Sequence, residues 1–252
     1  MLNEETKKNL YALRLVEMAS AWERQQSDPA CVGLGFDERF GLLVEAEYMT
    51  RENRRLGRRM KSAQLRVAEA CVEDVAPSSE RGLERSEMAQ LSSGRWLSAK
   101  QNVLISGPTG VGKSYVACAL GQLACRRGYS ALYRRVPRLF EELALARADG
   151  TYAKRLNQLA RVDVLILDDF GLGKTSENQR HDLLEVLEDR CGLRSVVVTS
   201  QLPVSKWHEW VGDATLADAI LDRLVHDAYK ITLKGPSRRR SRSLSCDEPA
   251  TT

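Results

Sequence analysis

The sequence of 252 residues lacks any run of about 18 apolar residues, the length that a membrane-spanning helix needs. Its first residues also lack the basic flank and the apolar stretch of a secretory signal. These two absences predict a cytoplasmic protein without a membrane partner. The length suits one domain of ordinary size with a small accessory domain.

Patterns for binding zinc or building a disulfide framework are also missing. The six cysteines include no C-x-x-C pair, and the three histidines have no metal-ligand spacing relative to them. We therefore expect reduced thiols and no zinc site. With 43% hydrophobic and 29% charged residues, the composition is that of a folded globular protein and argues against disorder or a coiled coil.

Positive charge is concentrated in two segments. Between Arg51 and Arg66, seven Lys and Arg residues accompany a single acid, Glu52, and residues 230–242 hold six more with no acid. Each segment therefore carries +6, whereas the net charge of the whole chain is +4, so the rest of the chain carries −8. Two basic segments on an acidic body favour contact with a polyanion.

Residues 1–72 predict an all-helical N-terminal domain, because apolar side chains recur there at helical spacing. Two or three helices are expected, one of them running from Phe36 to Arg66 with a break at Gly57. Residues 73–93 are polar and contain proline and glycine, so they predict a linker that separates this domain from the next.

Residues 94–236 alternate short β-branched runs with helical segments, a pattern typical of a parallel sheet covered by helices. The predicted strands are 102–106, 130–136, 162–167, 195–199 and 229–233. The predicted helices are 113–126, 138–148, 152–160, 176–190, 204–211 and 215–226. This pattern predicts an α/β domain with a five-stranded parallel sheet, followed at 237–252 by a basic tail that we expect to be disordered.

A complete phosphate-binding motif, G-x-x-x-x-G-K-[ST], lies between the first predicted strand and the helix after it. Its residues are Gly107, Pro108, Thr109, Gly110, Val111, Gly112, Lys113 and Ser114. In such a loop the glycines let backbone N–H groups turn toward a polyphosphate, Lys113 reaches the β- and γ-phosphates, and Ser114 can ligate Mg²⁺. The flanking strand and helix argue against a glycine-rich turn that binds nothing, so the sequence predicts a site for ATP and Mg²⁺.

Two acids, Asp168 and Asp169, follow the apolar run of the third predicted strand. Ligands of open α/β sheets gather at the carboxyl edge of the strands, so both carboxylates would face the phosphate loop. We expect Asp168 to hold Mg²⁺ through water and Asp169 to polarise the attacking water. The alternative is that the pair merely ends a strand; the order and spacing of loop and acids suit an ATPase better than a small-molecule kinase.

Two weaker candidates depend on position alone. Thr199, Ser200 and Gln201 end the fourth predicted strand, where polar side chains could sense a γ-phosphate or its water. Arg223 lies on an amphipathic helix among several acids, and its spacing is as compatible with a surface ion pair as with a functional role.

The first basic segment predicts a DNA contact. At about 100° per residue its cations occupy roughly half of the helix circumference, with apolar side chains opposite. The candidate residues are Arg51, Arg54, Arg55, Arg58, Arg59 and Lys61. Because the cations are not interleaved with acids, contact with the backbone of double-stranded DNA is favoured over a solvated charged face. No helix carries a base-reading arrangement, so binding should be sequence-tolerant.

Several segments together resemble one family. They are the phosphate loop and residues 167–171, 199–210, 213–224 and 233–237. Trp-His-Glu-Trp at 207–210 and Ala-Ile-Leu-Asp-Arg-Leu at 219–224 are the most discriminating. These segments resemble the IstB family, the helper ATPases of IS21-type transposons, which are related to DnaC-like helicase loaders within the AAA+ class. The likeness covers about residues 80–240, and more loosely the helical part before them.

The resemblance implies an AAA+ P-loop NTPase that oligomerises on duplex DNA, depends on ATP, and stimulates or targets a partner transposase. It implies Walker A at 107–114 and Walker B at Asp168 and Asp169. Gln201 or Ser200 would be the first sensor, and Arg223 would be an arginine finger acting on the neighbouring subunit.

The chain departs from the common AAA+ pattern at Asp169, where many members carry glutamate. The shorter side chain predicts slow hydrolysis and switch-like behaviour. Little chain follows Leu233, so Arg238 to Arg240 are only candidates for a second sensor or a DNA contact. Two alternatives stay open: a helicase loader of the same build, and a DNA-architectural protein that uses ATP without useful turnover.

Overall fold

The computed structural model describes residues 2–31 and 33–237, and the chain divides into two compact units, Met1–Arg58 and Arg59–Thr252. The predicted tail, with Arg238 to Arg240, lies outside the described residues. Within the described ranges, every helix is too short or too polar to span a bilayer.

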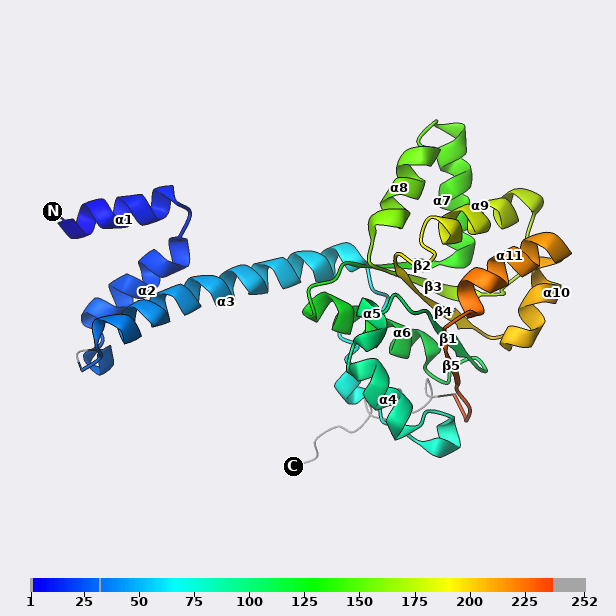
Figure 1. The fold of residues 1–252 in the computed structure, drawn as a ribbon, viewed down its shortest axis with the longest axis horizontal. Coiled ribbons are helices and arrows are strands. Elements are labelled where there is room, and N and C mark those ends of the chain that lie inside the picture. The colour runs from blue at the N-terminus through cyan, green and yellow to red at the C-terminus, as the bar shows by residue number, and fades with distance from the viewer. Residues whose placement is uncertain (1, 32, 238–252) are drawn as a thin grey trace, which may run out of the picture. The chain divides into compact units, whose positions relative to one another are not determined.

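The unit Met1–Arg58 is helical (Figure 1). Its elements are α1 (Leu2–Ala12), α2 (Val16–Ser27), the short 3₁₀ helix η1 (Pro29–Cys31) and the larger part of α3 (Phe36–Ala63). The chain turns between α1 and α2 at Arg14, whose φ is +58°. The backbone N–H groups of Glu17 and Met18 donate to the buried carboxylate of Glu47 at 2.9 and 3.0 Å, so a side chain of α3 caps the start of α2.

Helix α3 is continuous over 28 residues, so the predicted break at Gly57 is wrong. A glycine in an exposed helix interior costs only about 1 kcal/mol, which a helix of this length tolerates. The helix ends at Ala63, before the predicted end at Arg66, because the chain adopts a left-handed conformation at Gln64 (φ +49°).

The segment expected to be a linker, residues 73–93, contains regular structure. Here lie η3 (Ser79–Arg81) and α4 (Arg85–Ser92), and η2 (Val72–Asp74) and α5 (Arg95–Ser98) adjoin them. Leu83 and Leu91 are fully buried. Apolar anchors in a polar stretch therefore build this segment into the second compact unit.

The predicted five-stranded parallel sheet is confirmed. Its strands are β1 (Val103–Ser106), β2 (Ala131–Arg135), β3 (Val164–Phe170), β4 (Ser195–Ser200) and β5 (Tyr229–Thr232). Their order in the sheet is β2-β3-β4-β1-β5, and all pairs are parallel. Every residue of β1 and β4 is buried, which explains why their sequences are apolar or small throughout.

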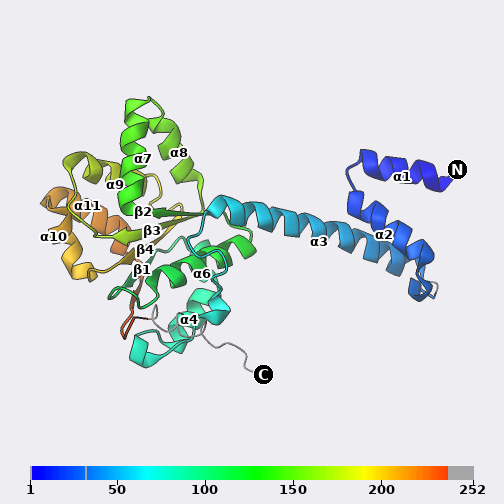
Figure 2. The ribbon, with the colours of Figure 1, turned by 180° about the vertical axis from the view of Figure 1, so that it is seen from behind.

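Helices cover both faces of this sheet (Figures 1 and 2). They are α6 (Lys113–Arg126), α7 (Val136–Ala148), α8 (Tyr152–Arg161), α9 (Glu177–Glu188), α10 (Trp207–Val211, after η4 at Val204–Lys206) and α11 (Ala214–Val225). Leu165 and Leu167 of β3 pack in the cluster formed with α7 to α11, whereas Ile166 lies against Gly121 of α6. Because side chains alternate along a strand, Asp168 emerges on the α6 face.

Candidate nucleotide site

The phosphate-binding motif forms the connection between β1 and α6. Gly107, with φ +144°, lies so close to the chain after β5 that a Cβ there would be 2.2 Å from the carbonyl oxygen of Leu233. Gly112, with φ +102°, directly precedes the first residue of α6. Both positions therefore require glycine, and the loop delivers the N-terminus of α6 to the carboxyl edge of the sheet.

Lys113 is the first residue of α6, and only 9% of it is exposed. Its Nζ donates hydrogen bonds to the carbonyl oxygens of Gly107 and Pro108 at 2.7 and 2.8 Å. The ammonium group thus lies over the loop itself. A cation and a helix N-terminus at one loop form a site that fits a polyphosphate.

Asp168, at the carboxyl end of β3, is fully buried at the start of α6. The Ser114 hydroxyl lies 2.9 and 3.0 Å from its two carboxylate oxygens. The hydroxyl groups of Tyr133 and Thr199 also donate to this carboxylate, and Arg66 Nη1 lies 3.5 Å from Oδ2. A charge that would be costly to bury alone is stabilised here by hydroxyl groups from three elements and by a guanidinium.

The Ser114–Asp168 pair fits Mg²⁺, because both side chains offer the oxygen donors that this ion prefers. Across residues 2–31 and 33–237, no cluster of three or more His, Cys, Asp or Glu side chains could form a closed metal cage. A hydroxyl and one carboxylate beside a phosphate loop suit an ion that completes its coordination with phosphate oxygens and water.

Tyr133 lies on β2 and packs beside Asp168 on the same face of the sheet. Burial raises the pKa of Tyr133 well above its ordinary value, and the hydrogen bond to the Asp168 carboxylate raises it further. The phenol therefore stays protonated and acts as a fixed donor to Asp168.

Asp169 adopts a different orientation from its neighbour. Its φ is +59°, and the pairing of β3 with β4 shifts register between Leu167 and Phe170. The carboxylate, expected to face the phosphate loop, lies 2.8 Å from Nε of Arg135 at the end of β2. Aspartate tolerates this left-handed conformation better than most residues, and the local bulge turns two adjacent acids toward different partners.

The end of β4 reaches the loop through one of the candidate sensors. Gln201 Oε1 accepts a hydrogen bond from the Thr109 hydroxyl at 2.9 Å. The Ser200 hydroxyl instead donates to the carbonyl oxygen of Phe170 at 2.6 Å, which holds β3 and β4 together beyond the bulge. Gln201 therefore contacts the motif through its side chain, whereas Ser200 contacts it through its backbone carbonyl oxygen, which accepts a hydrogen bond from the N–H of Gly107 at 3.1 Å.

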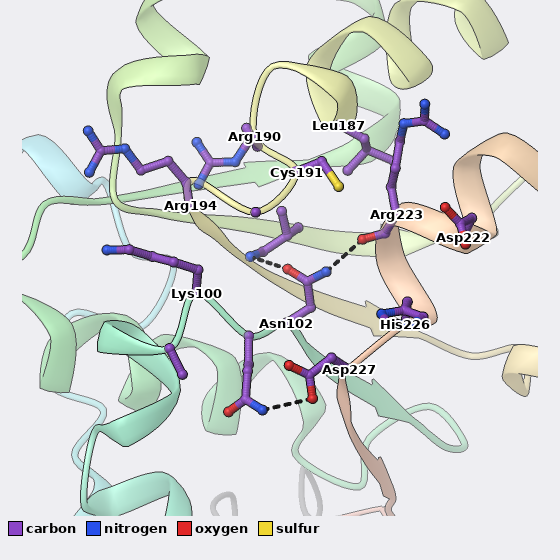
Figure 3. Close-up of a pocket in the computed structure, with 14 residues that line it drawn as sticks. Lys100, Asn102, Leu187, Arg190, Cys191, Arg194, Asp222, Arg223, His226 and Asp227 are labelled. Atoms are coloured by element: carbon purple, nitrogen blue, oxygen red, sulfur yellow. Dashed lines mark hydrogen bonds between the residues drawn. The ribbon is translucent and has the colours of Figure 1, made fainter.

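Arg223 lies at the opposite, amino edge of the sheet (Figure 3). Its carbonyl oxygen accepts a hydrogen bond from Asn102 Nδ2 at 2.8 Å, directly before β1, while its side chain extends away from Asn102. The guanidinium pairs with Glu188 at the end of α9, rather than with an acid of its own helix. Arg223 also lines a pocket of about 250 Å³ together with Arg190, Arg194 and other residues of this edge.

The candidate DNA-binding residues lie along the second half of α3. Arg51 pairs with Glu47 at 2.7 Å, and Arg55 pairs with Glu52, so two of the candidate cations have acidic partners on the same helix. Arg54, Arg58 and Lys61 are exposed, whereas Arg59 is half-buried.

Sequence reasoning gave no individual role to three side chains of this site, Arg66, Tyr133 and Arg135, and it named Thr199 only as a candidate sensor and not as a partner of Asp168. The contacts of Tyr133 and Thr199 with Asp168 could have been found, because each lies on a strand next to β3 and on the same face as Asp168. Arg66 was counted only as part of a basic run, and no local pattern connects Arg135 to Asp169.

Comparisons with known proteins identify the family of this chain. The family described as IstB-like ATP binding protein matches residues 8–246. The chain is 52% identical to a putative insertion sequence ATP-binding protein, y4pL, of Sinorhizobium fredii, over 96% of this chain and 98% of that one. It is 31% identical to the putative ATP-binding protein of insertion sequence IS21 of Pseudomonas aeruginosa, over 82% of this chain and 77% of that one.

Solved structures share the fold. The crystal structure of DnaI has a TM-score of 0.58 with 24% identity, over 66% of this chain and 92% of that one. The replication initiator DnaA bound to AMPPCP and single-stranded DNA has a TM-score of 0.56 with 18% identity, over 70% of this chain and 55% of that one. The α/β unit therefore has the AAA+ fold.

Proposed function

We propose that this chain, which belongs to the family of IstB-like ATP binding proteins, binds ATP with Mg²⁺ and hydrolyses it as the helper protein of an insertion sequence. One observation carries the proposal. The hydroxyl of Ser114, in the first turn of α6, lies within 3.0 Å of the buried carboxylate of Asp168. Both groups that would hold the ion are thus already adjacent to the loop that would hold the phosphates.

Each residue of the site has a distinct task in this proposal. The backbone N–H groups of residues 109–112 and the Lys113 ammonium bind the phosphates, with Lys113 exchanging its loop carbonyls for phosphate oxygens. Ser114 and Asp168 hold Mg²⁺, which supplies charge neutralisation to the phosphates when bound. Asp169 orients the attacking water, and Gln201, joined to the loop through Thr109, senses the γ-phosphate.

We further propose that ATP hydrolysis is completed between subunits by Arg223. The hydrogen bond from Asn102 places Arg223 beside the amino end of β1. The phosphate loop begins at Gly107, five residues after Asn102, which corresponds to about 16 Å along the extended strand. Arg223 therefore lies far from its own nucleotide site, and in this proposal its guanidinium exchanges Glu188 for the nucleotide of a second copy of the chain. This supports a homo-oligomer in which one subunit completes the site of the next.

The DNA part of the proposal depends on the basic face of α3. Arg54, Arg58 and Lys61 are exposed, and contacts from such cations to phosphates give sequence-tolerant binding of duplex DNA. A transposase encoded by the same insertion sequence is the proposed protein partner, and the cytoplasm the proposed compartment. A replicative helicase is the competing protein partner, because the DnaC helicase loader shares this fold.

A second candidate function, ATP as an assembly switch without useful turnover, is favoured by one observation. The Asp169 carboxylate is held in an ion pair with Arg135. Unless that ion pair opens on DNA or partner binding, hydrolysis would be slow.

The test uses the purified full chain with ATP and Mg²⁺, alone, with duplex DNA, and with DNA and the transposase. We expect nucleotide binding in every case, DNA affinity that falls steeply with salt, and faster hydrolysis when DNA and transposase are present. Substitution of the replicative helicase for the transposase is the control. Stimulation by the helicase alone would assign the chain to helicase loading, and absence of ATP binding would refute the proposal as a whole.

A further inference from the structure

Arg66 is the last residue of the first basic segment in the sequence, yet it lies beyond the end of α3 and its side chain lies at the nucleotide site. Its Nη1 is 3.5 Å from Oδ2 of Asp168, although 46% of the Arg66 side chain is exposed. A hydrogen bond with Tyr133 raises the pKa of Arg66, and the nearby carboxylates add to that effect. The guanidinium thus spans from solvent to a carboxylate that is fully buried.

The residue before Arg66 fixes this arrangement. Gly121 of α6 lies so close to β3 and to Leu65 that a Cβ there would be 2.7 Å from Ile166 Cδ1 and 2.9 Å from Leu65 Cδ2. Leu65 therefore packs where the helix of the phosphate loop crosses the strand of Asp168. The turn that ends α3 is anchored to both elements of the nucleotide site.

We propose that Arg66 is a positioning residue with two alternative anionic partners: the Asp168 carboxylate when the site lacks Mg²⁺, and a DNA phosphate when Mg²⁺ and ATP are bound. The proposal rests on the proposed function, since it takes the nucleotide and the DNA from there. It adds the route by which one ligand affects the other.

Electrostatics gives the reason for the exchange. Mg²⁺ held by Ser114 and Asp168 would bring two positive charges close to the guanidinium and would neutralise the carboxylate that now attracts it. Arg66 is half exposed and lies three residues after the end of α3, so its guanidinium can turn from Asp168 toward solvent, where a DNA phosphate could bind it. Because binding free energies are reciprocal, DNA that holds Arg66 would strengthen Mg²⁺ and nucleotide binding to the same extent.

The first experiment tests competition at Asp168 without DNA and without hydrolysis. The full chain is titrated with Mg²⁺ in the presence of a fluorescent, non-hydrolysable ATP analogue. For Arg66→Gln we expect half-maximal binding at about three- to tenfold lower Mg²⁺ than in the wild type, because an opposing charge is removed. Arg66→Lys keeps the charge and should keep the wild-type midpoint. An unchanged or higher midpoint in Arg66→Gln would overturn the competition.

The second experiment measures duplex DNA affinity with and without the Mg²⁺-bound analogue. In the wild type the analogue should strengthen DNA binding, and Arg66→Gln should lose most of that strengthening. Lys61→Gln is the matched control: it removes a cation of the same segment, so it should weaken DNA binding equally in both states and preserve the ratio. Preservation of the wild-type ratio in Arg66→Gln would overturn the proposal.

The two experiments test different parts of the proposal, so either one can give a negative result without the other. If the wild type bound no DNA, the DNA part of the proposed function and the second anion of this proposal would both be wrong. The Mg²⁺ midpoint would still decide whether Arg66 opposes the metal. If DNA bound normally but neither measurement responded to Arg66→Gln, the proposed function would stand and Arg66 would be a structural ion-pair partner only.

Discussion

Each edge of the parallel sheet holds a charged side chain without any exposed surface, Asp168 at one edge and Arg190 at the other, but the two edges stabilise these charges in different ways. At the carboxyl edge, Asp168 is held by side chains that can exchange for other ligands, namely the hydroxyl groups of Ser114, Tyr133 and Thr199. At the amino edge, Arg190 is held by backbone carbonyl oxygens, including those of Val162 and Ser195 at 2.8 and 2.7 Å.

This difference separates a site from a scaffold. A carboxylate surrounded by hydroxyl groups can accept a metal ion with small side-chain rotations, so its environment is compatible with ligand exchange. The guanidinium of Arg190 cannot leave without losing its hydrogen bonds to main-chain carbonyls at the end of α8, before β3 and at the start of β4. The amino edge also carries Arg223, whose partly exposed guanidinium pairs with a side chain, that of Glu188.

The largest effect is expected at Arg223. Arg223→Ala should bind ATP normally but hydrolyse it about 10³- to 10⁵-fold more slowly, since an arginine supplied by a neighbouring subunit contributes that much to phosphoryl transfer. Assembly on DNA should weaken as well. Steady-state turnover and nucleotide affinity, measured on the same preparation, check both parts.

A mixing experiment controls for misfolding. Arg223→Ala and Lys113→Ala are each expected to be inactive, but their mixture should regain some activity, because some interfaces pair an intact Lys113 with an intact Arg223. Normal turnover by Arg223→Ala alone would refute the intersubunit mechanism and would leave Arg223 as the ion-pair partner of Glu188.

At the carboxyl edge, binding and hydrolysis should respond to different residues. Asp169→Asn should leave ATP affinity within about threefold of the wild type while lowering turnover by roughly 10²- to 10⁴-fold, because it removes the carboxylate that polarises water. Lys113→Ala should lower ATP affinity by about a hundredfold, because it removes charge-assisted hydrogen bonds to phosphate. Isothermal calorimetry and turnover distinguish the two, and an equal loss of affinity in both variants would mean that the acids are misassigned.

The scaffold role of the amino edge predicts a loss of stability instead. Arg190→Met should lower the free energy of unfolding by about 3 kcal/mol, since it leaves buried carbonyl groups without donors. Arg194→Met is the matched control: its partly exposed guanidinium pairs with Asp163, so the loss should stay within about 1 kcal/mol. Denaturant titration measures the free energy of unfolding of both variants. Similar losses in the two would mean that the buried Arg190 stabilises the amino edge no more than a partly exposed ion pair does.

The sequence predicted the five strands because each is a short apolar run between turn signals. It predicted the phosphate loop and the position of Asp168 because residues that are adjacent in the sequence carry both signals. The helices within residues 73–93 were missed, since a few apolar anchors such as Leu83 and Leu91 decide their packing against a polar background.

Contacts between distant residues could not be predicted in the same way. Asp169 and Arg135 meet only because a register shift turns the second acid of the pair, and no composition signal marks such a bulge. Arg66 looked like a member of a DNA-binding face because sequence spacing alone assumes that the helix continues. The left-handed residue Gln64 ends it and redirects Arg66 toward Asp168.

The smallest expected effect comes from Tyr133→Phe, and it tests whether the carboxyl edge truly exchanges its partners. Without nucleotide, loss of the phenol hydroxyl should lower the free energy of unfolding by about 1 to 2 kcal/mol, because it removes one hydrogen bond to a buried charge. With saturating Mg²⁺ and ATP analogue the loss should shrink, since Asp168 then has another partner. Asn102→Ala at the amino edge is the control: its bonds to Val196 and to the end of α11 do not involve the nucleotide, so its loss should be the same in both conditions. If Tyr133→Phe lowered the free energy of unfolding equally with and without nucleotide, Asp168 would keep its partners when nucleotide binds. Asp168 would then be as fixed as Arg190, and the two edges would differ only in the sign of their buried charge.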